Sequence, residues 1–236
     1  MRGISGIMGT LYGATEWIMR FSVINILWFV INLPITIIIF IVSFSKSNAG
    51  YGHLLYLLPL LPLIPTLFVP STIAMYATAR DWVMKNEQKS LVKTYFLYMK
   101  ENYKQSFMSG LAILFIWLLW IVDFYYFNKI SDLLSILFLI IGLALFAFTI
   151  NFFSLSVHYQ MTSRELIKNT FFVTIGNPLL CFFILTSNLF LFYLSVWEFL
   201  FLLPLFTGSL SAYLSFSAFH RFTLKIEKQA MTHKSI

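Results

Sequence analysis

The chain has 236 residues, of which 59% are hydrophobic and 11% charged, and its formal net charge is +7. Soluble domains have about 45–50% apolar and about 25% charged residues, so this chain has too few charges to cover a surface in water. The composition excludes an ordinary soluble domain and predicts an all-α, polytopic membrane protein. A single cysteine, Cys181, excludes an intramolecular disulfide and a cysteine-based metal site.

Six apolar runs are long enough to cross a membrane, which takes about 20 residues. We expect spans at about 17–44, 54–79, 107–127, 133–157, 179–196 and 199–219. Together they make one transmembrane domain over 1–236. They are predicted to be helices because they lack the alternation of a transmembrane barrel strand. The first run lacks a cleavage site and is longer than a signal-peptide core, so we interpret it as a retained span.

The basic residues follow a pattern that predicts orientation. Fourteen of the 16 Lys and Arg residues fall in the two chain ends and in the loops at about 80–105 and 158–177, whereas Lys46 and Lys129 fall on the other side. Cytoplasmic loops are enriched in Lys and Arg. The pattern therefore predicts that both termini and both long loops are cytoplasmic, in a multi-pass protein of the cell membrane.

Each long loop is predicted to hold a basic amphipathic helix. The segment from Lys85 to Ser106 has no Gly or Pro, and at about 100° per residue its lysines gather opposite an apolar side. That apolar side consists of Leu91, Val92, Tyr95, Tyr98 and Met99. In the second loop, Thr162 and Glu165 have the spacing of a capping box, and Pro178 begins the next span.

The exposed sides of these helices are the candidate docking surface for a partner or for anionic lipid headgroups. The residues involved are Lys89, Lys93, Lys100, Lys104, Arg164 and Lys168. Both helices stand between two spans, which is the arrangement expected of an internal duplication, although coincidence explains it equally well.

The second predicted span carries four of the chain's seven prolines, Pro59, Pro62, Pro65 and Pro70. Each removes a backbone donor and frees a carbonyl that must find a partner within the protein. The span is therefore predicted to be kinked, either for packing or to line a cavity.

In the first span, Asn25 and Asn32 lie on one helical face. They either bond neighbouring helices or line a polar path. No ionisable residue lies near the middle of a span, which counts against an ion-coupled transporter.

Catalytic motifs are missing from the sequence. His53, His158, His220 and His233 lie in separate segments without metal-ligand spacing. There is no Gly-x-Ser-x-Gly motif and no phosphate-binding glycine loop. We predict no enzyme activity, no cofactor and no metal site, and we interpret the basic side as facing lipid or a partner rather than nucleic acid.

The run from Tyr12 to Arg20 (YGATEWIMR), followed by Asn25-Ile26-Leu27-Trp28, resembles the opening of the YesL/YteU-like family. The stretch from Pro70 to Ala77 (PSTIAMYA), ahead of a basic loop, also resembles that family. Its members are membrane proteins of Firmicute bacteria with unknown function, and no catalytic residue is transferred. The resemblance implies a bacterial plasma membrane location, and ABC importer subunits or a sensor kinase as partners.

Two functions fit these observations. The first is a non-enzymatic accessory or interaction subunit of a membrane assembly, with a carbohydrate ABC importer as the candidate assembly. The alternative is a transporter-like protein that moves a neutral or amphiphilic solute, with the proline-rich span as its gate.

Overall fold

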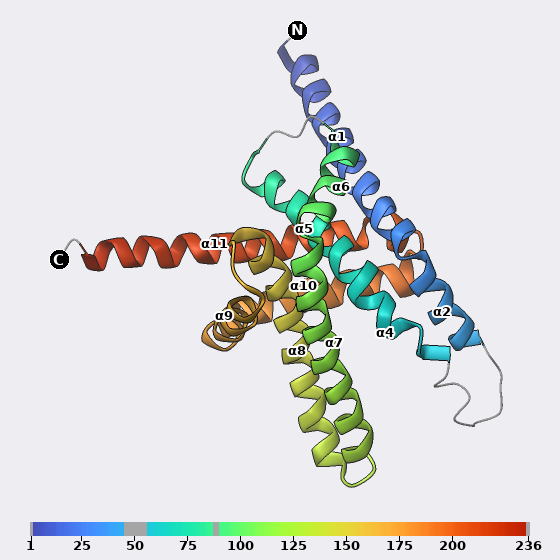
Figure 1. Cartoon of the computed structure of the whole chain (residues 1–236). Helices are drawn as coiled ribbons and strands as arrows, with labels where there is room; N and C mark the ends of the chain where they lie inside the picture. The colour runs from blue at the N-terminus through green and yellow to red at the C-terminus, as the bar shows by residue number, and fades with distance from the viewer. Residues whose placement is uncertain (1, 45–55, 87–89, 235–236) are drawn as a thin grey trace.

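The computed structural model describes residues 2–44, 56–86 and 90–234, and side chains from residue 11 to residue 228 within these ranges. The described chain consists of helices joined by turns, with no strand. Figure 1 shows the helices spreading from a central region that contains α5 (Val69–Val83). The predicted all-α fold class is confirmed.

The other elements follow in chain order. They are α1 (Arg2–Ile31), α2 (Leu33–Phe44), α4 (Leu60–Leu63), the π-helical turn η1 (Ile64–Phe68), α6 (Leu91–Glu101), α7 (Tyr103–Phe127), α8 (Asp132–His158), α9 (Ser163–Gly176), α10 (Pro178–Tyr193), the π-helical turns η2 (Leu194–Glu198) and η3 (Leu203–Thr207), and α11 (Gly208–Lys234).

Five helical segments of the described chain are long and apolar enough to cross a membrane. They are Leu11–Ile31, Leu60–Val83, Tyr103–Phe127, Asp132–His158 and Pro178–Glu198. The predicted segment 199–219 is not among them. Its helix begins only at Leu203, with η3, and α11 continues to Lys234, so that its second half is charged. The count of six and the orientation stay predictions.

The core is built around α5. Thirteen of its 15 residues are buried, and it packs against α1, α6, α7, α8 and α11. Its sequence is rich in Ala, Ser and Thr, and such small side chains let neighbouring helices approach closely. By contrast, the hairpin of α7 and α8 extends away from this centre (Figure 1), and its outer half is largely exposed and apolar.

The proline-rich segment is a distorted helix. The π-helical turn η1 connects α4 to α5 and contains Pro65, which is buried. The hydroxyl of Thr66 donates to the carbonyl of Pro62 at 2.6 Å, and that of Thr72 donates to the carbonyl of Phe68 at 2.6 Å. Hydroxyls of the same helix thus donate hydrogen bonds to backbone carbonyls where the prolines interrupt the backbone hydrogen bonding of the helix.

Asn25 joins the first helix to the last one. Its side-chain amide donates to the carbonyl of Leu203 at 2.8 Å, and its Oδ1 accepts the backbone N–H of Ser209 at 2.9 Å. A Cβ at Gly208 would lie 2.9 Å from that same oxygen, so glycine permits the close approach. Asn25 therefore caps α11 across η3, where Pro204 interrupts the backbone ladder.

Candidate docking surface on two basic helices

Two tyrosines fix α6 on α5. The hydroxyl of Tyr95, fully buried, donates to the carbonyl of Ser71 at 2.9 Å. One turn further, the hydroxyl of Tyr98 donates to Oδ2 of Asp81 at 2.5 Å. Because both acceptors belong to α5, the position of α6 depends on side-chain bonds to a neighbouring helix.

Arg80 and Asp81 form a polar cluster at the end of α5. Arg80 Nη2 lies 3.0 Å from Oδ1 of Asp81, its Nη1 donates to the carbonyl of Val157 in α8 at 2.6 Å, and its guanidinium lies 5.5 Å from the ring centre of Tyr98. Asp81 is 3% exposed. Burial and the hydrogen bond to Asp81 raise the pKa of Tyr98 to about 12. The hydroxyl of Tyr98 therefore keeps its proton at neutral pH. The cluster joins α5, α6 and α8.

The second basic helix, α9, begins with its own cap. Thr162 accepts the backbone N–H of Glu165, and Glu165 accepts the backbone N–H of Thr162 at 3.0 Å, so the predicted capping box is present. The backbone N–H and the hydroxyl of Thr162 both donate to the carboxylate of Glu165 and lower its pKa. On the inner side of α9, Leu166 and Thr170 are fully buried. Pro178 begins α10, as predicted.

Tertiary bonds then attach α9 to the bundle. The amide of Gln105 in α7 donates to the carbonyl of Met161, just before α9, at 2.6 Å. Near the other end of the helix, Asn151 of α8 donates to the hydroxyl of Thr174 at 3.2 Å. Both basic helices are thus held at two points along their length.

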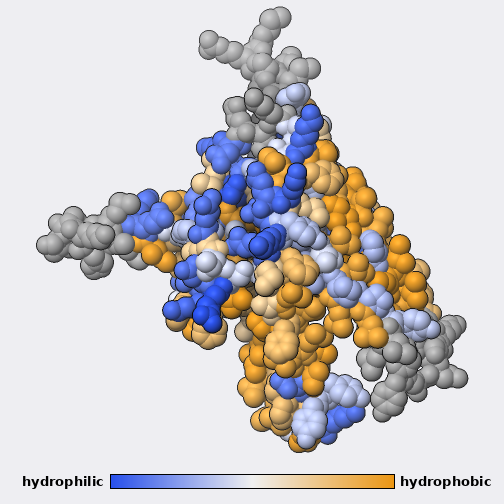
Figure 2. Space-filling view, viewed as in Figure 1, coloured by the Kyte–Doolittle hydropathy of each residue, from blue (hydrophilic) through white to orange (hydrophobic). Residues whose placement is uncertain are grey.

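Five of the six predicted docking residues lie in the described chain, and all five are exposed. They are Lys93, Lys100, Lys104, Arg164 and Lys168. None of the five forms an ion pair with another described residue. Lys89 lies outside the described residues. Figure 2 shows hydrophilic side chains gathered around α6 and α9, while the side of α1 and the α7–α8 hairpin are mostly hydrophobic.

Two details of the predicted first amphipathic helix are wrong. The helix begins at Leu91 and is interrupted at Asn102, so Lys104 belongs to α7 instead of lying on one continuous helix with Lys93. Val92, expected on the inner side, is 42% exposed. The amide of Asn102 donates to the carbonyl of Tyr98 at 3.1 Å. This local bond competes with the regular ladder and accompanies the break.

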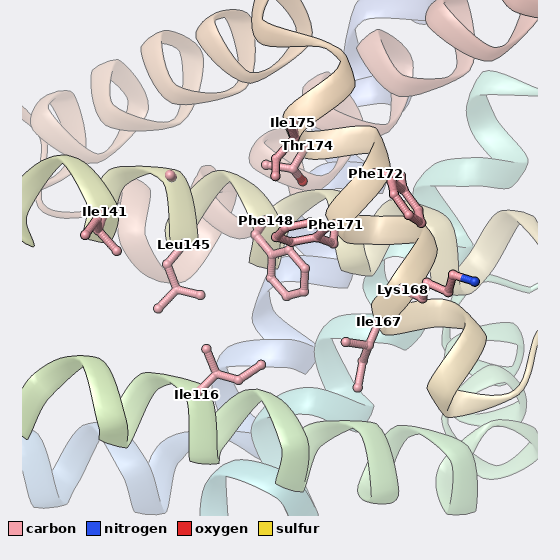
Figure 3. Close-up of a pocket in the computed structure, with 11 residues that line it drawn as sticks. Ile116, Ile141, Leu145, Phe148, Ile167, Lys168, Phe171, Phe172, Thr174 and Ile175 are labelled. Atoms are coloured by element: carbon pink, nitrogen blue, oxygen red, sulfur yellow. The ribbon is translucent and has the colours of Figure 1, made fainter.

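An apolar cavity of about 520 Å³ lies between α7, α8 and α9. In Figure 3 the side chains of Ile116, Phe148 and Phe171 face the space between these helices, and the Nζ of Lys168 points away from them at the rim. Its size is that of a small-molecule site, but its lining is hydrocarbon apart from Lys168 and Thr174. A lining with so few polar groups is suited to an apolar ligand.

The predicted intramembrane site residues are dispersed. Asn25 bonds to the start of α11, whereas Asn32 donates to the hydroxyl of Ser71 in α5 at 2.9 Å. Pro65 and Pro70 are buried and Pro59 and Pro62 exposed. None of these residues lines the cavity between α7, α8 and α9.

Sequence reasoning did not single out the Arg80–Asp81–Tyr98 cluster. The sequence contains one indication, because Asp81 lies two residues after the end of an apolar run and next to a basic residue. A carboxylate at the end of a span needs a partner, but the sequence alone does not identify Tyr98, which lies one helix away.

No group of three or more histidine, cysteine, aspartate or glutamate residues that could hold a metal ion occurs among the described residues. No solved structure matches the chain. Residues 21–124 match the family described as "Protein of unknown function, DUF624".

Two curated relatives come from Bacillus subtilis (strain 168). The chain is 24% identical to "Uncharacterized protein YesL" over 219 residues, covering 90% of this chain and 91% of the relative. It is 22% identical to "Uncharacterized protein YteU" over 226 residues, covering 94% and 89%. These matches support the assignment of the chain to a YesL/YteU-like family of helical membrane proteins whose function is unknown.

Proposed function

We propose that the chain is a non-enzymatic accessory subunit of a membrane assembly, and that α6, the first turn of α7 and α9 present its docking surface. The observation that carries the proposal is the state of five basic side chains, Lys93, Lys100, Lys104, Arg164 and Lys168. They are exposed and without an ion pair within the described chain, although their helices are fixed by buried bonds. Charges held in a fixed position favour the encounter with an acidic partner and set its orientation.

Polar groups within the bundle support the same proposal. Asn25, Asn32 and Asn188 all donate hydrogen bonds to backbone or hydroxyl oxygens of neighbouring helices or of their own helix. Side chains used in this way join helices. The assembly that the family resemblance implies is a carbohydrate ABC importer.

The test is copurification of the tagged full-length chain from native cells in a mild detergent, with mass-spectrometric identification of its partners. We expect transporter subunits or a sensor kinase in stoichiometric amounts. The double variant Lys100→Glu/Arg164→Glu is expected to reduce their yield at least fivefold. Lys129→Glu is the matched control, because Lys129 is an exposed cation at the turn between α7 and α8, far along the chain from the docking surface. A chain that always purifies alone contradicts the proposal, as does equal loss in the control.

A second function, carriage of a neutral or amphiphilic solute, is favoured by one observation. The described chain contains three π-helical turns, η1 between α4 and α5, η2 at the end of α10 and η3 at the start of α11, and such turns are frequent at functional sites. Uptake of solutes into proteoliposomes tests it, with Pro62→Ala/Pro65→Ala as the variant. Flux that the variant abolishes would favour a carrier, whereas no flux under any gradient argues against one.

A further inference from the structure

A groove of about 830 Å³ runs between α10 and α11 and combines an apolar floor with a basic end. The floor on the α10 side is formed by one helical face, with Leu179, Phe182 and Phe183 spaced three and four residues apart. On the α11 side Leu214, Ala218 and Phe222 follow at four-residue intervals. The aromatic rings are largely uncovered, since Phe182 is 68% exposed. An apolar groove of this extent is a binding site rather than a scattered surface feature.

The basic end is made by Arg221 and Lys225, one turn apart on α11 and both exposed. Neither forms an ion pair within the described chain, and no carboxylate lines the groove. Glu227, two residues after Lys225, is not among the residues that line it. The first turn of α10 also lies at this end, next to Asn177. The side chain of Asn177 does not cap α10, so the free N–H groups of that first turn add partial positive charge.

From these features we propose that the groove binds an anionic phospholipid, with its phosphate between Arg221 and Lys225 and its acyl chain against Phe182 and Phe183. Length supports this occupant. From Asn177 to Thr186 the groove follows α10 for about 13 Å, close to the thickness of one leaflet of hydrocarbon, about 15 Å. Charge supports it too, because the basic end lies on the side that the distribution of Lys and Arg assigns to the cytoplasm, where anionic lipids are enriched.

The site differs from the docking surface of α6 and α9, since it shares none of the five exposed cations. It also differs from the apolar cavity in Figure 3. That cavity has one cation at its rim, whereas the groove has two cations one turn apart together with a helix N-terminus. Of the groove and the apolar cavity, only the groove is therefore expected to select an anionic headgroup.

The proposal is tested by native mass spectrometry of the purified full-length chain, titrated with phosphatidylglycerol or phosphatidylcholine of the same acyl chains. One tightly retained phosphatidylglycerol is expected, with at least tenfold weaker retention of phosphatidylcholine. Arg221→Gln/Lys225→Gln is expected to weaken the retention of phosphatidylglycerol about tenfold. The matched control Lys93→Gln/Lys100→Gln removes the same charge from α6 and is expected to retain the lipid.

A second variant, Ala218→Trp, fills the groove without changing its charge and is expected to reduce retention of both lipids. Glycerol phosphate at the same concentration is not expected to compete, because it lacks the acyl chain. Equal retention of the two lipids, full retention in Arg221→Gln/Lys225→Gln, or displacement by glycerol phosphate would each overturn the proposal. Variants are compared only where their thermal unfolding matches that of the wild type.

Discussion

The two basic helices α6 and α9 have similar positions in the chain, each between two long helices, but they are held in different ways. α6 has no side-chain cap at Ser90 and depends on Tyr95 and Tyr98, which bond to α5. α9 begins with a capping box built from its own residues. One helix is therefore ordered by its neighbour and the other partly by its local sequence, although both present exposed cations.

The largest effect is expected from Asp81→Ala. Removal of the carboxylate leaves Arg80 and the hydroxyl of Tyr98 without their partner at a site that is 3% exposed. Breaking such a buried pair costs about 3 kcal/mol of unfolding free energy. Equilibrium unfolding in mixed micelles measures the change. Asp123→Ala, at an exposed carboxylate of α7, serves as the control and is expected to change it by less than about 0.5 kcal/mol. Equal effects would show that Asp81 does not organise α6.

Tyr98→Phe is expected to cost about 1.5 kcal/mol, because its hydroxyl bonds to a carboxylate, and Tyr95→Phe about 1 kcal/mol, because its acceptor is a neutral carbonyl. Hydrogen exchange followed by mass spectrometry should show faster exchange of the amides of α6 and unchanged exchange in α9. If α9 loses protection to the same degree, the two helices are not held independently.

Thr162→Ala is expected to cost about 1 kcal/mol, confined to the first turn of α9, because it removes the acceptor of the capping bond. Ser90→Ala makes the equivalent change at the start of α6, where the side chain forms no capping bond, and should have little effect. Exchange rates of the amides in the first turn of each helix measure both. A larger effect at Ser90 would reverse the comparison.

The smallest effect is a dependence on pH at the start of α9. The pKa of Glu165 is lowered by its hydrogen bonds to Thr162 from an ordinary value of 4.5. Its contribution to the helix is therefore complete above pH 4.5 and is lost as the pH falls through the lowered pKa. Exchange in the first turn of α9, corrected for intrinsic rates, should rise below that pH, and Glu165→Gln should abolish the dependence. A pH-independent rate would contradict the role of this carboxylate.

Local features of the fold were predictable from the sequence. The length and apolar composition of the runs predict five of the helical segments. The spacing of Thr162 and Glu165 predicts a cap whose hydrogen bonds all lie within four residues. The exposure of Val92 was missed because it depends on how α6 packs on α5, and the break at Asn102 was missed because it involves a side-chain bond to the backbone that periodicity does not reveal. The groove was missed for the same reason, since Arg221 and Phe182 come together only through the packing of α10 on α11.

The bond between Asn25 and the start of α11 has a consequence for biosynthesis. Asn25 lies in α1, and its partners, Leu203 and Ser209, are translated 178 and 184 residues later. Until then its amide remains unpaired in or near lipid, which costs several kcal/mol. Chains truncated before α11 should accordingly be recognised as incompletely packed by membrane quality-control proteases.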